Sequence, residues 1–227
     1  MKTTPPVPSY LEEHYWWAYV RPWSTGLLDR QWLINIALCG YYERLVGATL
    51  EEFGSDLSGK TLQISCCYGD LTPQLGERIA KVGGELDVID ILPVQLENLR
   101  HKLRGEHARL FQMDSSALAF PDGTYDRALI YFLLHEQPQE VREKTAAEAF
   151  RVLKPGGKLV IVDYGKPSAR HPLRYLLLPL LGVVEPFAIP LWNHELSEVL
   201  PHQLGHHACV KQSYFGELYQ AVVYAKT

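Results

Sequence analysis

The chain has 227 residues, of which 47% are hydrophobic and 21% are charged, close to the averages of globular proteins. This length fits one sizeable α/β domain, and the composition excludes a disordered, collagenous or coiled-coil chain. The formal charge is −4 and no run of Lys or Arg supplies a positive field, so no nucleic-acid partner is expected. The longest charge-free apolar stretch, residues 175–184, is too short to cross a bilayer.

The cysteines and the amino terminus point to a reducing compartment. Four cysteines are present, and their spacing fits neither a zinc site nor a disulfide framework. The first eight residues lack the apolar stretch of a signal peptide. A location on the cytoplasmic side of a membrane is therefore expected.

Residues 1–55 are predicted to form a helical cover rich in aromatic side chains, with most of the tryptophans before position 33. Pro22 is expected to break this segment, and Ser24 to cap a second helix. Apolar residues then recur every three to five positions, at Leu28, Trp32, Ile36, Gly40 and Leu45. This spacing predicts one helix with a continuous apolar face.

From residue 56 to residue 166 the pattern predicts a core of strands alternating with helices. The predicted strands are 61–66, 85–90, 107–112, 125–133 and 158–163, and the predicted helices are 71–82, 93–104 and 138–153. Pro155-Gly156-Gly157 is expected to end the last helix. Such alternation predicts parallel strands with helices on both faces, hence a doubly wound α/β fold.

Two further segments follow this core. A Leu- and Pro-rich insert, 167–207, is expected to face the substrate. Segments 208–214 and 219–225 are predicted to pair as an antiparallel hairpin, so that residues 208–227 complete the sheet.

Ligands of an open parallel sheet bind beyond the carboxyl ends of its strands. Asp90 ends the second predicted strand, about 20 residues after Gly69, where a carboxylate accepts hydrogen bonds from ribose hydroxyls. It also fits a helix N-cap. Asp114, followed by Ser115, ends the third strand and suits the amino group of adenine. The loop after the first strand holds a single glycine, Gly69, and by itself fits an ordinary strand–helix turn as well.

Five ordered segments, 61–70, 87–92, 112–114, 119–126 and 151–158, resemble the motifs of class I S-adenosylmethionine (SAM)-dependent methyltransferases. They are most similar to the branch that methylates quinone precursors. The resemblance implies a seven-stranded, mostly parallel Rossmann-type sheet with an antiparallel C-terminal hairpin, and SAM as cofactor. The residues expected to bind SAM are Ser65, Cys67, Tyr68, Gly69, Asp90, Ile91, Asp114 and Ser115.

The first loop departs from this family pattern. Gln63 stands where the family usually has an acidic residue, and Ser65 and Cys67 stand where it has glycines. A Cβ at a glycine position narrows the approach of the backbone to a ligand, and losing the carboxylate removes a partner for the methionine ammonium group. The methionine end of SAM is therefore expected to sit differently from the usual pose.

Several segments resemble a narrower group, the rhodoquinone-biosynthesis enzymes. These segments are 14–19, 30–33, 132–138, 162–164, 171–174, 185–187 and 191–192. The resemblance implies an enzyme that replaces a ring methoxy group of ubiquinone by an amino group, with SAM as amino donor and Mn²⁺ as the preferred metal. A lipid substrate of this kind implies peripheral contact with the cytoplasmic face of a bacterial inner membrane, although a soluble cytoplasmic protein also fits. The Trp-rich segment and residues 176–181 would supply the apolar surface.

His135 and Asp163 follow the fourth and fifth predicted strands and should meet at the reacting centre. They are predicted as catalytic residues and as Mn²⁺ ligands; a hydrogen-bonded histidine near the cofactor and a polar anchor are the alternatives. Tyr19 lies four residues after Tyr15 and is expected to close over the cofactor or quinone, unless both rings pack on the core. Two other functions stay open: methyl transfer to a quinone precursor, and non-catalytic binding of a quinone or a partner. The sequence does not indicate an oligomeric state.

Overall fold

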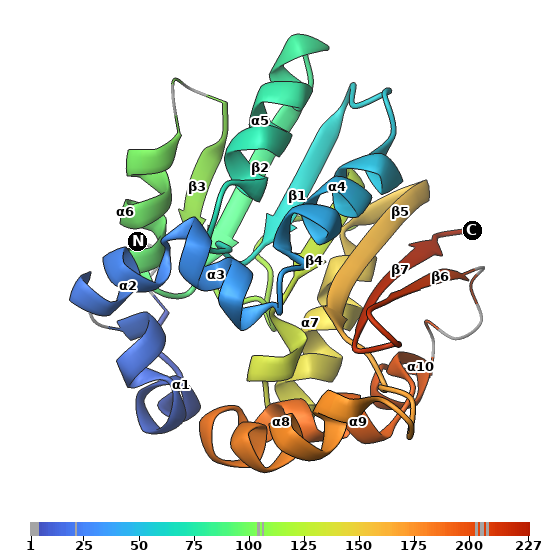
Figure 1. Ribbon diagram of the computed structural model, residues 1–227. Coiled ribbons are helices and arrows are strands. Elements are labelled where there is room, and N and C mark those ends of the chain that lie inside the picture. The colour runs from blue at the N-terminus through green and yellow to red at the C-terminus, as the bar shows by residue number, and fades with distance from the viewer. Residues whose placement is uncertain are drawn as a thin grey trace.

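A seven-stranded sheet forms the centre of the computed structural model, which describes residues 5–20, 22–103, 105, 107–202, 204, 207 and 209–227 (Figure 1). The strand order is β3-β2-β1-β4-β5-β7-β6. The strands are β1 (Lys60–Ile64), β2 (Glu85–Asp90), β3 (Arg109–Gln112), β4 (Tyr125–Tyr131), β5 (Leu153–Tyr164), β6 (Cys209–Tyr214) and β7 (Tyr219–Ala225). Strands β1 to β5 pair in parallel, whereas β7 is antiparallel to both β5 and β6. The predicted fold class is confirmed.

Helices cover both faces of this sheet. Helices α4 (Tyr42–Phe53), α5 (Leu71–Lys81) and α6 (Pro93–Lys102) pack on one face, and α7 (Gln139–Arg151) packs on the other. Because successive strand side chains point to opposite faces, β4 contributes Leu129 and Tyr131 to the first layer, and Ala128 and Ile130 to the second. All four are buried, which explains why the strand has no polar alternation.

The Pro-Gly-Gly turn does not end a helix, contrary to the prediction. Helix α7 already ends at Arg151, and β5 begins at Leu153, which pairs with Tyr125. The register then shifts, so that the turn forms an irregularity within β5. Gly156 has a φ of +79°, and a Cβ on Gly157 would lie 2.9 Å from the carbonyl oxygen of Lys154. The glycines are therefore required by this bulge.

The N-terminal cover does not contain the single helix that the apolar spacing from Leu28 to Leu45 predicts. The cover consists of α1 (Ser9–His14), a π-helical turn η1 (Trp16–Val20), α2 (Pro22–Leu28) and α3 (Gln31–Ala37). Pro22 is the first residue of α2, and Ser24 lies inside that helix, so Ser24 is not its cap. Cys39 and Gly40 have positive φ angles and separate α3 from α4. Trp32 and Ile36, both on α3, are consequently exposed to solvent. Leu45, on α4, is buried in the core.

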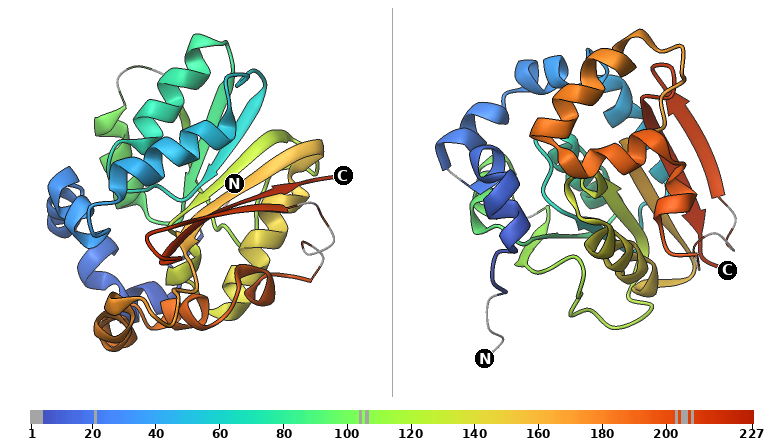
Figure 2. Two further views of the ribbon diagram at one scale, coloured as in Figure 1. Left: turned by 45° about the vertical axis from the view of Figure 1, so that its right-hand side comes forward. Right: turned by 90° about the horizontal axis from the view of Figure 1, so that it is seen from below.

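The insert folds into short helices at the same edge of the sheet as the N-terminal cover (Figures 1 and 2). These are α8 (Pro172–Val184), the 3₁₀ turn η3 (Pro186–Ala188), α9 (Ile189–Asn193) and α10 (Leu196–Val199). Another 3₁₀ turn, η2 (Leu134–Glu136), follows β4 at this edge. Among the helices of the described residues, none has the length and hydropathy needed to span a bilayer.

Candidate cofactor and substrate site

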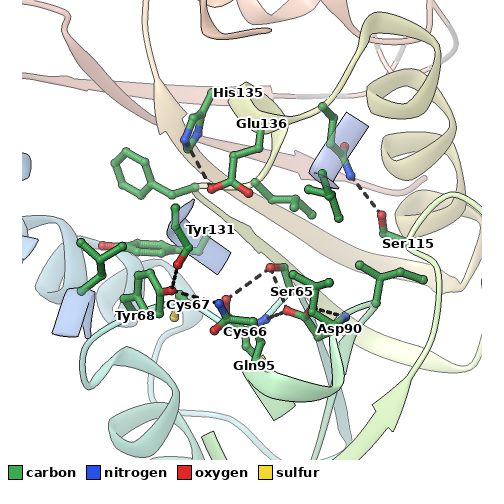
Figure 3. Close-up of a pocket in the computed structure, with 18 of the residues that line it drawn as sticks. Ser65, Cys66, Cys67, Tyr68, Asp90, Gln95, Ser115, Tyr131, His135 and Glu136 are labelled. Atoms are coloured by element: carbon green, nitrogen blue, oxygen red, sulfur yellow. Dashed lines mark hydrogen bonds and ion pairs between the residues drawn. The ribbon is translucent and has the colours of Figure 1, made fainter. Parts of the chain in front are cut away.

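A cavity of about 270 Å³ lies at the carboxyl ends of the parallel strands, below the N-terminal cover (Figure 3). The loops after β1, β2, β3 and β4 form its floor, as expected for this fold. Of the residues predicted from sequence, those that line it are Ser65, Cys67, Tyr68, Asp90, Ile91, Asp114, Ser115 and His135. Gly69 and Asp163 lie outside this lining, and the side chain of Tyr19 lies outside the described residues.

The first loop keeps, at Ser65, a backbone conformation that is typical of glycine. Ser65 has a φ of +75°, a region that non-glycine residues seldom adopt. Gln63 is fully buried, and its Nε2 donates to the carbonyl oxygen of Ser65 (3.0 Å) and to Oγ1 of Thr72 (2.8 Å). The first strand therefore presents a neutral amide, bonded to its own loop, where a carboxylate would hold an ammonium group.

Cys67 and Tyr68 shape the wall of the cavity. The thiol of Cys67 lies 3.3 Å from Oγ1 of Thr72, and burial raises the thiol pKa, so it stays neutral. The hydroxyl of Tyr68 donates to the carbonyl oxygen of Ala18 (2.8 Å) and accepts from Nε2 of Gln95 (3.0 Å). Tyr68 thus ties the first loop to both the N-terminal cover and α6.

Gly69 serves packing rather than ligand approach. Its φ is +86°, and a Cβ there would lie 2.1 Å from the hydroxyl oxygen of Tyr42. Its amide donates to Oδ1 of Asp29 (2.5 Å). Asp29 also accepts from Asn98 (2.7 Å) and pairs with Lys102 (2.8 Å), both on α6. Asp29 was not predicted from the sequence, because nothing local to the α2–α3 turn marks it as a contact of a loop 40 residues away.

Asp90 is held mainly by the backbone. Its Oδ2 accepts from the amide of Cys66 (2.8 Å) and from Oγ of Ser65 (3.3 Å), and its Oδ1 accepts from the amide of Leu92 (2.8 Å). Burial raises the pKa of Asp90 to about 6, although these hydrogen bonds act in the opposite direction. The thiol of Cys66 also bonds to Asp90. A carboxylate has about four acceptor positions, so a ribose hydroxyl would replace one of the two side-chain donors, Ser65 or Cys66. The N-cap of α6 is Leu92, so the N-cap interpretation of Asp90 is wrong, whereas its role as ribose partner stays a prediction.

Asp114 and Ser115 lie at the adjacent strand end. Oδ1 of Asp114 accepts from the amide and the hydroxyl of Ser116, both at 2.8 Å, which leaves Oδ2 to the cavity. Ser115 bonds to Thr145 on α7 (2.9 Å) and accepts from Nε2 of Gln137 (3.1 Å). This set of acceptors and hydroxyls suits the edge of a purine ring.

His135 and Asp163 meet, as predicted. Nδ1 of His135 lies 2.9 Å from Oδ1 of Asp163, and both side chains are buried. Asp163 also accepts from the amides of Leu134 (2.9 Å) and Tyr164 (2.7 Å), so it fixes the turn η2 that carries His135. Although burial lowers the pKa of His135, nearby carboxylates, led by Asp163, raise it to about 9. The imidazole is therefore protonated at neutral pH, with its Nε2 facing the cavity.

Two glutamates complete this end of the cavity. Oε1 of Glu136 lies 3.7 Å from Nε2 of His135, and Oε2 of Glu185 lies 3.9 Å from the same atom. Glu136 directly follows His135 in the sequence. Its position after the fourth predicted strand could therefore have identified it as a candidate site residue. Glu185 comes from the insert between α8 and η3, and only its place in a resembling segment marked it.

The described side chains do not form a ready Mn²⁺ site. Within the described part of the chain, no group of three or more His, Cys, Asp or Glu residues is arranged to hold a metal ion. Both oxygens of Asp163 already accept protein N–H groups. Ligation of Mn²⁺ by His135 and Asp163 stays a prediction, and no step below depends on a metal.

Aromatic rings pack together where the cover meets the insert. Phe187 of η3 packs edge-on against Tyr10 (centroids 6.0 Å apart) and against His14 (5.2 Å), both on α1. Tyr15 is almost fully buried beside Phe187. Tyr10 also lines the cavity, so this cluster joins the insert to the cavity wall.

Comparison with known proteins agrees with this architecture. Residues 61–157 match the family model described as a methyltransferase domain. Over 161 residues the chain is 33% identical to the ubiquinone/menaquinone biosynthesis C-methyltransferase UbiE of Stutzerimonas stutzeri, covering 66% of this chain and 62% of that protein. The match thus spans less than two thirds of the length of such curated relatives.

Solved structures show the same fold. A SAM-dependent methyltransferase from Aquifex aeolicus has a TM-score of 0.59 at 20% identity, covering 91% of this chain and 99% of that one. The N-methyltransferase NodS from Bradyrhizobium japonicum WM9, in complex with S-adenosyl-L-homocysteine, has a TM-score of 0.55 at 16% identity, covering 82% and 86%. Residues 61–157 are therefore similar to a methyltransferase domain, and the described residues share the fold of these solved methyltransferases.

Proposed function

We propose that the protein is a SAM-dependent transferase that modifies a quinone. Asp90 would hold the ribose and Asp114 the adenine amino group, with Ile91 and Ser115 against the nucleoside. The fit rests on two carboxylates that line one cavity, Asp90 with exchangeable side-chain donors and Asp114 with Oδ2 not engaged by Ser116. When bound, SAM supplies a transferable amino group or an activated methyl group. The apolar remainder of the cavity suits an aromatic ring.

The reaction that we propose is replacement of a methoxy group of the ubiquinone ring by an amino group. The observation that carries it is the altered first loop, in which the buried amide of Gln63 replaces a carboxylate and bonds to Ser65 and Thr72. A loop rebuilt in this way does not hold the amino-acid end of SAM in the pose that presents the methyl group. The resemblance to rhodoquinone-biosynthesis enzymes supports the same reaction.

His135 would act as a general acid in this exchange. Its protonated Nε2 faces the cavity and can donate a proton to the methoxy oxygen, which then leaves as methanol. The imidazolium of His135 would be restored by the proton that the nitrogen of SAM releases on bonding to the ring carbon. Transfer of the amino group also requires cleavage of the bond between that nitrogen and Cα of SAM, for which water would be the co-reactant that leaves a hydroxyl group on Cα. Asp163 holds the ring through Nδ1 and stabilises its charge.

Methylation of a quinone precursor is the second candidate function. The relatives named as C-methyltransferases of ubiquinone and menaquinone biosynthesis favour it. In that reaction His135 would instead accept a proton, which the raised pKa of its imidazole disfavours at neutral pH.

Labelled cofactor separates the two reactions. The protein is incubated with a short-tailed ubiquinone and SAM that carries ¹⁵N in its amino group and ¹³C in its methyl group, and the quinones are analysed by mass spectrometry. Amination gives a product that contains ¹⁵N and has lost a methoxy group, and His135→Gln should lower its yield by about 100-fold. A ¹³C-methyl product would support methylation, and the absence of both labels despite SAM binding would support a non-catalytic binding protein.

We also propose that the protein contacts a membrane surface, on the cytoplasmic face, while it takes up its lipid substrate. Large apolar side chains are exposed on α8 and on the N-terminal helices, at the edge where the cavity lies: Trp23, Trp32, Ile36, Tyr175, Leu176, Leu180 and Val183. Tryptophan and leucine in such a surface favour the bilayer interface. The double variant Leu176→Asp/Val183→Asp should co-sediment with vesicles less than the wild type does. Val210→Asp, at an exposed valine on β6, should co-sediment as the wild type does. Equal binding of all three proteins would contradict the proposal.

A further inference from the structure

The end of the cavity around His135 carries more negative than positive charge. Three carboxylates face this imidazole: Asp163 at 2.9 Å from Nδ1, and Glu136 and Glu185 at 3.7 and 3.9 Å from Nε2. The buried guanidinium of Arg142 interacts with Asp163 and donates to backbone carbonyls behind η2. Two cations therefore balance three anions, and one negative charge is left for a ligand that enters the cavity.

One carboxylate oxygen at this end lacks a hydrogen-bond donor from the described part of the chain. Oε2 of Glu185 is buried, and within the described residues it has no hydrogen-bond partner, while the hydroxyl of Tyr164 bonds to the same carboxylate. Glu136 projects into the cavity toward the side of Ser65 and Asp90 (Figure 3). A buried carboxylate oxygen without a donor is costly, and a cationic N–H donor removes that cost.

The other acidic groups of the cavity, Asp90 and Asp114, are assigned to the nucleoside in the proposed binding mode. Asp90 accepts protein hydrogen bonds, and Asp114 holds the turn at Ser116. The first strand offers only the neutral amide of Gln63, whose Nε2 is a donor and whose buried Oε1 has no hydrogen-bond partner among the described residues. An ammonium group of a ligand bound at Asp90 thus finds charged acceptors at the His135 end and not at the first loop.

We infer that Glu136 and Glu185 bind the ammonium group of the amino-acid end of SAM. This inference rests on the proposed binding of the nucleoside end of SAM at Asp90 and Asp114, and it deepens that proposal by assigning the other end. The ammonium nitrogen is then seated beside His135. This position brings nitrogen, in place of the methyl carbon, to the end of the cavity where the proton donor lies.

Two ligands test the assignment by calorimetry in buffer that contains EDTA, so that no metal ion bridges the carboxylates. S-adenosylhomocysteine carries the ammonium group, whereas 5′-methylthioadenosine has the same nucleoside and lacks the amino-acid end. The variants are Glu136→Gln and Glu185→Gln, which keep the shape of the side chain and remove its charge. Glu140→Gln, on the exposed face of α7, is the matched control.

Each cavity variant should weaken S-adenosylhomocysteine about tenfold and leave 5′-methylthioadenosine unchanged, the loss expected for one charge-assisted hydrogen bond. Glu140→Gln should change neither affinity. Unchanged S-adenosylhomocysteine affinity in both cavity variants, or an equal loss for both ligands, would overturn the assignment while leaving the nucleoside site in place. A wild-type protein that binds neither ligand would remove the proposed function and this inference together.

Discussion

The two ends of the cavity are stabilised by different means. At the nucleoside end, backbone amides hold Asp90, and Asp114 is fixed by its own turn. At the reacting end, side chains from β4, β5 and the insert hold one another through charge, with His135 at the centre. The backbone contacts at the nucleoside end allow it to keep its shape while the chemistry of the domain changes. The charged side chains at the reacting end can be replaced one at a time, so this end determines the chemistry of the domain.

Removing the charge of Asp163 should have the largest effect. Asp163→Asn replaces one of the two oxygens by an NH₂ group, which faces the N–H of either Leu134 or Tyr164, and leaves the imidazolium of His135 without its closest counter-ion. Breaking a buried pair of this kind costs about 3 kcal/mol or more in the free energy of unfolding, which urea denaturation measures. The imidazole pKa, followed by NMR, should fall from about 9 toward its ordinary value.

Asp122→Asn is the matched control for that variant. Asp122 pairs with Arg151 at the surface, with 80% of its side chain exposed, so its loss should change stability by less than about 1 kcal/mol. If the two variants unfold at the same urea concentration, the reacting end is not held by charge in the way described above.

Gln63→Glu should be the next most disruptive change. The new carboxylate would face the carbonyl oxygen of Ser65 at the place where Nε2 now donates, and it would be fully buried. We expect a loss of about 2 kcal/mol in the free energy of unfolding. Gln31→Glu, at an exposed position in the first turn of α3, should cost nothing, because an acidic residue is favourable there. A Gln63→Glu variant as stable as the wild type would show that the loop can hold a carboxylate after all.

Sequence reasoning located cavity residues where they lie at strand ends. Asp90, Asp114 and His135 each follow a strand, and parallel strands bring their carboxyl ends together, so these residues were found without knowledge of packing. Asp29 was missed, and Glu185 was marked only by its place in a resembling segment, because tertiary packing, and no local pattern, brings them to the site.

Two local patterns were misleading for related reasons. Gly69 fits a ligand-approach glycine, but the space above it is filled by Tyr42. The apolar spacing from Leu28 to Leu45 continues across the break at Gly40, so it suggested one helix where three short ones form. Periodicity reports which side chains are apolar; it does not report whether they meet the core or remain exposed.

Nucleoside binding should weaken in acid because of Asp90. Its pKa of about 6 means that the carboxylate is ionised at pH 7.5 and mostly protonated at pH 5, where it is a poorer acceptor for ribose hydroxyls. The affinity for 5′-methylthioadenosine should fall about tenfold between these two values. His135 stays protonated throughout this range and does not contribute. Asp90→Asn should bind weakly with no pH dependence, and a flat profile for the wild type would exclude Asp90 as the ribose partner.

The smallest expected effect is at Ser65, which adopts a φ of +75° where glycine is favoured. Ser65→Gly relieves this strain but loses the 3.3 Å hydrogen bond to Asp90, whereas Ser65→Ala loses the bond and keeps the strain. The glycine variant should therefore be more stable than the alanine variant by about 1 kcal/mol in urea denaturation, and equal stability would contradict the strain. If the glycine variant also exceeds the wild type in stability yet binds 5′-methylthioadenosine less well, the serine is kept for its contact with Asp90. The nucleoside end would then have been tuned by a side chain as well, and the contrast between the two ends would be one of degree.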